Sequence, residues 1–292
     1  MDGVFNVLKP PAMTSHDVVA FLRRALQTKK IGHGGTLDPD AAGVLPVFAG
    51  TATRLLEFAV EGQKEYIAEF TLGLQTDTGD DTGEVIKTMP VPAFDETFLQ
   101  ETLNSFLGKQ MQTPPMYSAL KIDGQKLYQL ARKGIEVERE AREIDVYELE
   151  LLNYTQNTFT VRIKCSKGTY IRVLGEDICA ALGSCGTMSF LLRTQVGGFL
   201  INEAHTLAEI AENPQSCMSE SINAVNELAK VKLTAKQAFR VTSGVRTTIR
   251  GLEDGRYAIL GPEEQFLGIG SAAESMLKAE KILEHYPKPE ED

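Results

Sequence analysis

Two segments of the chain alternate hydrophobic and polar residues in the way that predicts strands with one buried face. In KEYIAEFTL (residues 64–72), the residues on the apolar face are Tyr66, Ala68, Phe70 and Leu72. In FTVRIKC (residues 159–165), they are Phe159, Val161, Ile163 and Cys165. We expect each strand to cover a core on one side and to face solvent on the other.

Two other segments show the spacing of amphipathic helices. Thr14 and Asp17 have the spacing of a capping box, and the apolar positions that follow are Val18, Leu22 and Leu26. They predict a helix over residues 15–27. A second helix is indicated by Ile171, Leu174, Ile178 and Leu182, with Gly183 as its C-cap. Tyr170 and Arg172 then lie at a strand-to-helix junction, on the same side if the junction is extended.

Both ends of the chain carry further elements. GVFNVLKPP near the N-terminus predicts a strand that ends at two prolines. Near the C-terminus, LTAKQAFRVTSG predicts a capped helix, and RYAIL and QFLGIG predict short strands. Between them lies the polar segment ENPQSCMSES, which shows neither the helical nor the strand periodicity and is interpreted as a linker. We therefore predict a larger domain over residues 1–226 and a small β domain over residues 227–292, whose tail, HYPKPEED, is disordered.

Composition adds the class of protein and a charge pattern. The 292 residues are 42% hydrophobic, with no apolar run of about 20 residues and no secretion signal at the N-terminus, which predicts a soluble, cytoplasmic protein. The formal charge of −10 argues against nucleic acid as a partner, but basic residues gather between Lys109 and Arg172. A basic surface on an acidic protein remains compatible with RNA.

Cysteine and histidine spacings indicate neither a metal site nor a redox pair. The cysteines are Cys165, Cys179, Cys185 and Cys217, and the histidines are His16, His33, His205 and His285. None of their spacings matches a zinc or disulfide pattern, so we expect no metal and no cofactor. The acidic run QTDTGDDTGEV resembles a calcium loop only loosely, and an acidic turn between strands is the preferred interpretation.

The stretch GHGGTLDPDAAGVLPV (residues 32–47) carries the candidate chemistry. Its glycines allow positive φ values or close backbone approach, but its spacing matches no phosphate-binding loop. Asp38 precedes Pro39 and is therefore held in a stiff turn, as suits a nucleophile or base. The residues alone leave open that Asp38 and Asp40 are ordinary turn residues.

Four segments together resemble one family. KIGHGGTLDPDAAGVLPV is similar to the GHxGTLDPxAxGxL signature of the TruB family, the tRNA pseudouridine-55 synthases. KPPAMTSHD, PPMYSALKIDGQKLYQLARKG and CSKGTYIR resemble its other motifs in the same order. Two departures are Ala12, where glycine is usual, and Leu192, where LRRT has its first arginine. The resemblance covers most of the chain.

The resemblance implies an α+β pseudouridine synthase fold with a mixed, largely antiparallel central sheet and a small C-terminal PUA-like β-barrel. Asp38 would be the catalytic aspartate, Arg172 its guanidinium partner, which would lower its pKa, and Tyr66 the tyrosine that stacks on the displaced uracil. Tyr170 and Leu191 correspond to residues around the base. The reaction requires no metal and no organic cofactor.

Uracil stacked in a tRNA loop must be extruded, and the resemblance makes His33 the residue that fills the gap. The candidates for phosphate contacts are Lys9, Lys121, Lys126, Arg132, Lys133 and Lys167, with Arg246 and Arg250 in the C-terminal domain. We thus expect a monomeric enzyme that isomerises uridine 55 in the TΨC loop of tRNA. Two rivals are a tRNA-binding or tRNA-folding module with secondary catalysis, and an aspartate-dependent hydrolase.

Overall fold

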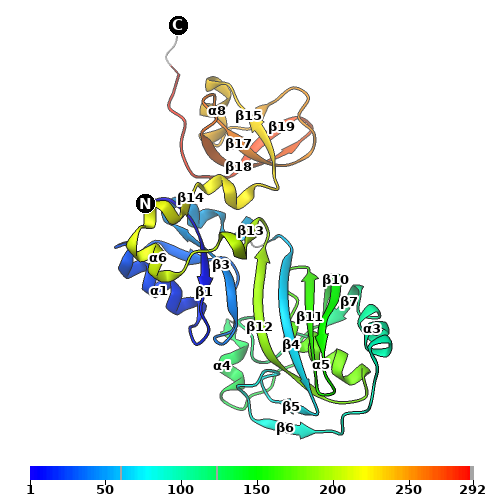
Figure 1. The fold of residues 1–292 in the computed structure, drawn as a ribbon. Coiled ribbons are helices and arrows are strands. Elements are labelled where there is room, and N and C mark those ends of the chain that lie inside the picture. Colours follow the sequence, from blue (N-terminus) through cyan, green and yellow to red (C-terminus); the bar gives the residue numbers. More distant parts are fainter. Residues whose placement is uncertain (60, 123, 290–292) are drawn as a thin grey trace.

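A mixed sheet of ten strands organises most of the chain in the computed structural model, which describes residues 1–59, 61–122 and 124–289 (Figure 1). The strands follow the order β14, β1, β3, β12, β4, β11, β10 and β7, with β2 beside β3 and β13 beside β12. Their bounds are β1 (Gly3–Lys9), β2 (Ile31–His33), β3 (Ala42–Ala49), β4 (Lys64–Leu72), β7 (Gly108–Gln112), β10 (Arg142–Tyr154), β11 (Thr158–Cys165), β12 (Gly186–Val196), β13 (Phe199–Leu200) and β14 (Met218–Ser219). Among the strands that the structure describes in this sheet, β12 and β3 form the one parallel pair, which confirms the mixed, largely antiparallel sheet.

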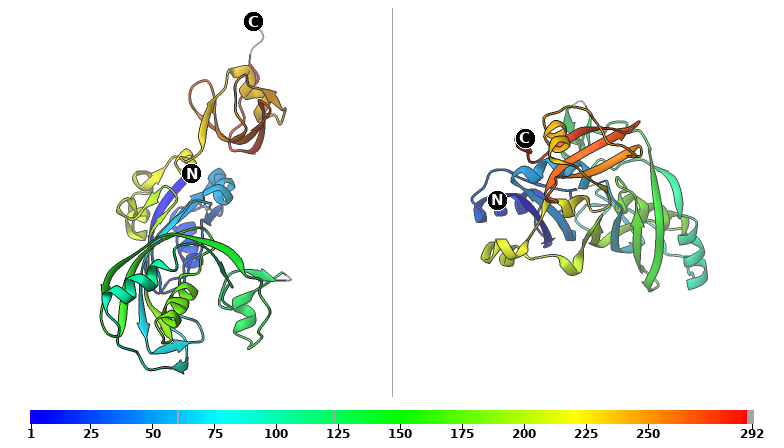
Figure 2. Two further views of the ribbon diagram at one scale, coloured as in Figure 1. Left: turned by 90° about the vertical axis from the view of Figure 1, so that its right-hand side faces the viewer. Right: turned by 90° about the horizontal axis from the view of Figure 1, so that it is seen from above.

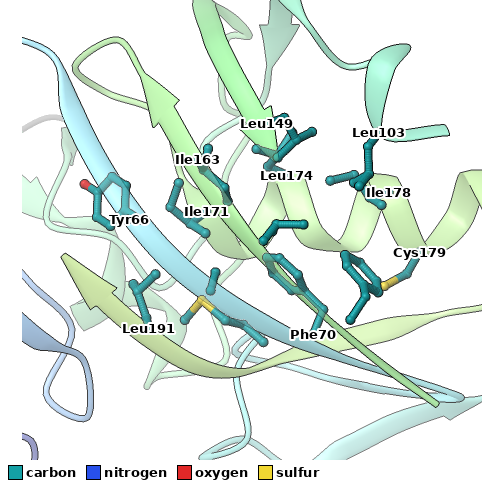
Figure 3. Packing of buried hydrophobic residues seen from close by; sticks show 14 of the residues in the cluster. Tyr66, Phe70, Leu103, Leu149, Ile163, Ile171, Leu174, Ile178, Cys179 and Leu191 are labelled. Atoms are coloured by element: carbon teal, nitrogen blue, oxygen red, sulfur yellow. The ribbon is translucent and has the colours of Figure 1, made fainter. Parts of the chain in front are cut away.

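Helices cover the sheet at two places and bury the apolar faces that the sequence predicted. Helices α3 (Glu96–Asn104) and α5 (Ile171–Ala181) pack on the β4, β10, β11 and β12 region (Figure 3). There Gly175 of α5 lies against the ring of Phe70, and a Cβ at that position would collide with the ring. Helices α1 (Ser15–Ala25) and α6 (Leu207–Glu212) pack against β1 and β3 in a separate cluster.

Shorter elements connect this framework. They are η1 (Gly50–Leu55), α2 (Leu56–Ala59), β5 (Leu74–Thr76), β6 (Val85–Thr88), β8 (Lys121–Ile122), β9 (Gln125–Lys126), α4 (Leu127–Ala131), η2 (Ile201–Glu203), α7 (Pro214–Cys217) and η3 (Ser221–Val225). The acidic run QTDTGDDTGEV forms the turn between β5 and β6, as expected. The segment around α4 stands off the main sheet (Figure 2).

The C-terminal part forms a second sheet with its own core, as a PUA-like domain does. Its elements are β15 (Ala229–Lys232), α8 (Ala235–Thr242), β16 (Thr247–Thr248), β17 (Gly255–Leu260), β18 (Phe266–Ala273) and β19 (Met276–Ile282). Thr234 caps α8 in a complete capping box. We propose the boundary at residues 226 and 227. Val225 packs with Ala258 and Ile269, so an apolar contact joins the two parts.

Three expectations about boundaries need correction. Helix α1 ends at Ala25 rather than at residue 27. The proposed linker at residues 212–221 is wrong, because Met218 and Ser219 pair with β1 and Cys217 is buried in its cluster. The tail is not wholly disordered, because Tyr286 packs against the C-terminal core and its N–H donates to Thr242 Oγ1. Residues 290–292 of that tail lie outside the described residues.

The two departures from the family pattern have distinct local settings. Ala12 adopts a φ of 60°, in an exposed turn, which explains why glycine suits this position. Leu192 is partly buried on β12, paired with Ala42 on one side and Ile67 on the other.

Replacing Ala12 by Gly is expected to leave the free energy of unfolding unchanged or to raise it by up to about 1 kcal/mol. Relief of the left-handed conformation is offset in part by the greater freedom of glycine in the unfolded chain. Ala12→Val, with a β-branched side chain at positive φ, is expected to lower it by about 1–2 kcal/mol. Urea denaturation measures both, and a fully tolerated valine would contradict the argument.

Candidate active site

The loop between β2 and β3 carries Asp38, and buried side chains from other segments anchor its backbone. Lys9, fully buried at the end of β1, donates from its Nζ to the carbonyl oxygens of Pro39 (2.8 Å) and Ala41 (2.6 Å). Ser15, at the start of α1, accepts from the Leu37 N–H and donates to the Leu37 carbonyl oxygen. The residues on both sides of Asp38 are therefore fixed.

Arg193 of β12 is the third anchor and is 1% exposed. Its guanidinium donates to three carbonyl oxygens of the same segment, those of Gly35 (3.1 Å), Thr36 (3.4 Å) and Val44 (2.8 Å). Its backbone pairs with Gly43 of β3, where a Cβ would collide with the Arg193 carbonyl oxygen. A planar guanidinium can donate to several fixed acceptors at once, so this position suits arginine better than lysine.

The burial of Lys9 corrects its assignment as a phosphate contact. Its ammonium donates to three carbonyl oxygens, the third being that of Pro10, and is closed to solvent. Burial lowers the pKa of Lys9 to about 8, with Asp40 and Asp38 opposing, so the ammonium stays largely protonated at neutral pH. Lys9 is thus a structural residue beneath the loop.

Replacing Lys9 by Met is expected to lower the free energy of unfolding by about 2–4 kcal/mol, because buried carbonyl groups lose their donor. Chemical denaturation followed by circular dichroism measures this loss. Lys29→Met, at an exposed position, serves as control and is expected to stay within about 0.5 kcal/mol of the parent. Equal stability of both variants would contradict the anchoring role.

Arg172, in the first turn of α5, contacts the Asp38 carboxylate side-on. Its Nε lies 3.1 Å from Oδ2 and its Nη2 lies 3.3 Å from Oδ1. The other donors of the guanidinium reach the carbonyl oxygens of Thr78 (2.6 Å) and Tyr117 (2.8 Å). Asp80 Oδ2 lies 3.9 Å from the same Nε. Arg172 therefore joins the aspartate to the β5–β6 turn and to the segment that leads to α4.

Arg172 lowers the pKa of Asp38, as expected, but the net shift of this pKa is upward. Burial raises the pKa of Asp38 above the usual range, Asp80 adds to that rise, and Arg172 offsets only part of it. The side chain keeps 33% of its surface exposed, which lets solvent moderate the effect. The ion pair aims the carboxylate, but it does not make it a stronger acid than an ordinary aspartate.

Tyr66 and Tyr170 lie in the buried surroundings of Asp38. Burial raises the pKa of Tyr66 to about 12, and the positive charge of Arg193 offsets part of that rise. Figure 3 shows the Tyr66 hydroxyl at the edge of the core cluster, directed away from the other labelled side chains. Tyr170 is fixed through its backbone, because the Gln112 side chain accepts from its N–H and donates to its carbonyl oxygen. Both phenols are protonated at neutral pH, since burial also raises the pKa of Tyr170.

The remaining predicted residues lie at the periphery. His33 is half-buried at the end of β2, and burial lowers its pKa, so its imidazole is neutral at physiological pH. Lys167 is exposed in the turn before Tyr170, with its Nζ 3.7 Å from Glu61. Within the described ranges, no group of three or more His, Cys, Asp or Glu side chains could hold a metal ion.

Asp38 lines a cleft with a volume of about 440 Å³. Three segments line it: residues 38–41, 80–82 and 188–191. Leu191 shares this cleft with Asp38, whereas Tyr66, Tyr170 and Arg172 do not contribute to its lining. The space is large enough for a nucleoside.

Sequence reasoning missed Ser15, Asp80 and Arg193. Arg193 carried one usable signal: the alternation of SFLLRTQV places it on the same side as Leu191, so a charged residue points inward. Ser15 lies in KPPAMTSHD but has no distinguishing feature. Asp80 is one of several acids in its turn, and nothing in the sequence separates it from Asp77 or Asp81.

The sequence model of the TruB family pseudouridylate synthases, N-terminal domain, matches residues 23–171, more than half of the chain. The chain belongs to this family. A TruB-family relative, tRNA pseudouridine synthase B of Caldanaerobacter subterraneus subsp. tengcongensis, is 44% identical over 97% of this chain and 99% of its own length. The enzyme of the same name from Moorella thermoacetica is 53% identical over 72% of this chain and 70% of its own.

Solved structures agree with TruB-family membership across both domains. A chain in the structure of a Cbf5–Nop10–Gar1 complex has a TM-score of 0.77 and 28% identity, covering 98% of this chain and 87% of that one. A chain of an H/ACA RNP bound to a substrate RNA containing 2′-deoxyuridine has the same TM-score and coverage at 26% identity. The predicted fold class is thereby confirmed. No helix among the described residues is long and apolar enough to span a membrane.

Proposed function

We propose that this protein isomerises uridine to pseudouridine at position 55 in the TΨC loop of tRNA. The observation that carries the proposal is the pairing of Arg172 with Asp38 beside a cleft that can admit a nucleoside. Relatives over nearly the full chain are tRNA pseudouridine synthases. The reaction breaks the bond from C1′ to N1, joins C1′ to C5, and moves one proton from C5 to N1.

We propose roles for the site residues that combine the family resemblance with the contact between Arg172 and Asp38. Asp38 is the essential carboxylate that drives cleavage of the glycosidic bond, and Arg172 aims it. Tyr66 is 6% exposed beside the site, and we propose that its ring contacts the uracil once the base has entered. Its protonated hydroxyl can donate a proton but cannot accept one. Tyr170 and Leu191 contact the base, while Lys167 contacts RNA phosphate after leaving Glu61.

The rival reading as a tRNA-binding or tRNA-folding module predicts binding without chemistry. Incubating the purified protein with an unmodified tRNA transcript and mapping pseudouridine by carbodiimide modification and primer extension separates the two. We expect one pseudouridine, at position 55. Intact binding without pseudouridine would favour the rival, and release of free uracil would favour an aspartate-dependent hydrolase.

His33 is proposed to enter the tRNA loop and stack where bases were, since its neutral ring is flat and uncharged. His33→Ala is expected to lower kcat/KM on folded tRNA about 10- to 100-fold, and less on a minimal stem-loop whose bases unstack more easily. Single-turnover kinetics on both substrates measure the difference. Equal losses on the two would contradict the stacking role.

The oligomeric state and the cellular location of the protein are also part of the proposal. We propose that the protein acts as a monomer, which size-exclusion chromatography with light scattering tests. We also propose a cytoplasmic location, in keeping with four buried free cysteines.

A further inference from the structure

Phe190 is an exposed aromatic residue at the rim of the Asp38 cleft. It is 47% exposed and lines the cleft, whereas its neighbour Leu191 is 8% exposed and belongs to the core. Exposing a large aromatic side chain is unfavourable in the free protein, which makes such a residue at a binding cleft a candidate contact.

A bulge in β12 sets the direction of Phe190. The register of β12 against β4 shifts between Met188 and Phe190, which leaves Ser189 as the extra residue. Ser189 Oγ donates to Glu69 Oε1 at 2.8 Å and stabilises this irregularity. Bulges beside active sites commonly redirect side chains. Because successive residues of a strand face opposite sides, Phe190 and Leu191 contact different groups.

Charge limits what the cleft can bind. Among the described residues its charged side chains are all carboxylates: Asp38, Asp40, Asp80 and Asp81. Arg172 is nearby, but it is 5% exposed and its donors are directed to Asp38 and to two backbone carbonyl groups. Phosphate groups are therefore repelled from this cleft, and a neutral, flat nucleobase is the part of RNA that fits.

We propose that Phe190 stacks on a nucleobase that flanks the target uridine in the RNA. This inference rests on the proposed function, in which Asp38 acts on that uridine. Both residues line the cleft: Leu191, at its buried wall, faces the target base, and Phe190, at the exposed rim, stacks on the base that precedes or follows the target in the RNA. Stacking of this kind tolerates any base, so it positions the substrate without adding sequence specificity.

Kinetics of Phe190 variants on a tRNA stem-loop test the proposal. Phe190→Ala is expected to raise KM and Kd about 10-fold while kcat stays within about twofold. Phe190→Tyr is expected to restore binding, and Phe190→Leu, which is apolar but not aromatic, is not. Ile86→Ala, at an exposed apolar position of β6, is the matched control and should behave as the parent.

Stem-loops with an abasic site on the 5′ or the 3′ side of the target identify the stacked base. One of the two should weaken binding by the parent protein about 10-fold and leave Phe190→Ala unaffected. If the alanine variant does not fold, Phe190→Leu gives the same comparison. The proposal is overturned if Phe190→Ala binds as the parent does, or if its loss is the same with and without both flanking bases. Failure of the parent to make pseudouridine in the intact stem-loop would instead reject the proposed function.

Discussion

Replacing Asp38 by Asn is expected to lower kcat by at least about 10⁴-fold and to leave the affinity for tRNA within about threefold of the parent. Asparagine keeps the size and shape of the side chain but carries no charge to drive cleavage of the glycosidic bond, and its amide group accepts from Arg172 through one oxygen only. Pseudouridine formation under single-turnover conditions, together with filter binding of the same tRNA, measures both quantities.

Asp40→Asn is the matched control for this variant. Asp40 lines the same cleft two residues further along, but it makes no contact with Arg172 that the structure describes. We expect its kcat to stay within about fivefold of the parent. A loss that is equally large for both variants would mean that the acidity of the cleft matters rather than one carboxylate.

Replacing Arg172 by Lys is expected to lower kcat/KM by about 100-fold or more. Lysine keeps the positive charge, but a single ammonium cannot contact both carboxylate oxygens of Asp38 and also the carbonyl oxygens of Thr78 and Tyr117. Steady-state kinetics on full-length tRNA measure the loss. Near-normal turnover would show that the Arg172 guanidinium is not needed for the reaction.

The pH profile of the same variant gives a second readout with a defined sign. Because burial raises the pKa of Asp38 and Arg172 opposes that rise, weakening the contact raises the pKa further. The role proposed for Asp38 needs the ionised carboxylate, so kcat/KM is expected to fall as pH decreases through this pKa. The acidic limb of the profile should therefore move to higher pH in Arg172→Lys. A shift to lower pH would contradict this electrostatic account.

The parts of the fold that the sequence predicted are those with strong periodicity. Strand β4 has the predicted bounds, and the inward positions from Tyr66 to Leu72 are buried. The pairing of Asp38 with Arg172 followed from the motifs, although the residues alone left Asp38 open as a turn residue. Periodicity did not predict the pairing of Met218 and Ser219 with β1, because two residues are too few to show a pattern.

Buried polar residues are harder to predict from the sequence. Lysine is mostly exposed in proteins, so the sequence makes Lys9 a candidate for a phosphate contact, whereas its ammonium lies buried beneath the loop. The pKa of Asp38 depends on how much solvent the fold removes from it, which no motif reveals. In both instances the decisive quantity is burial, a property of the complete fold rather than of the local sequence.

The three anchors of the Asp38 loop come from two distant parts of the sequence: Lys9 and Ser15 lie near the N-terminus, and Arg193 lies in β12. A fragment that stops before β12 would contain Asp38, Tyr66 and Arg172. It would lack the Arg193 guanidinium, which donates to the carbonyl oxygens of Gly35, Thr36 and Val44. During synthesis, Lys9 and Ser15 are available to the loop early, whereas the Arg193 donors arrive only with β12, so we expect Asp38 to reach its final position late in folding.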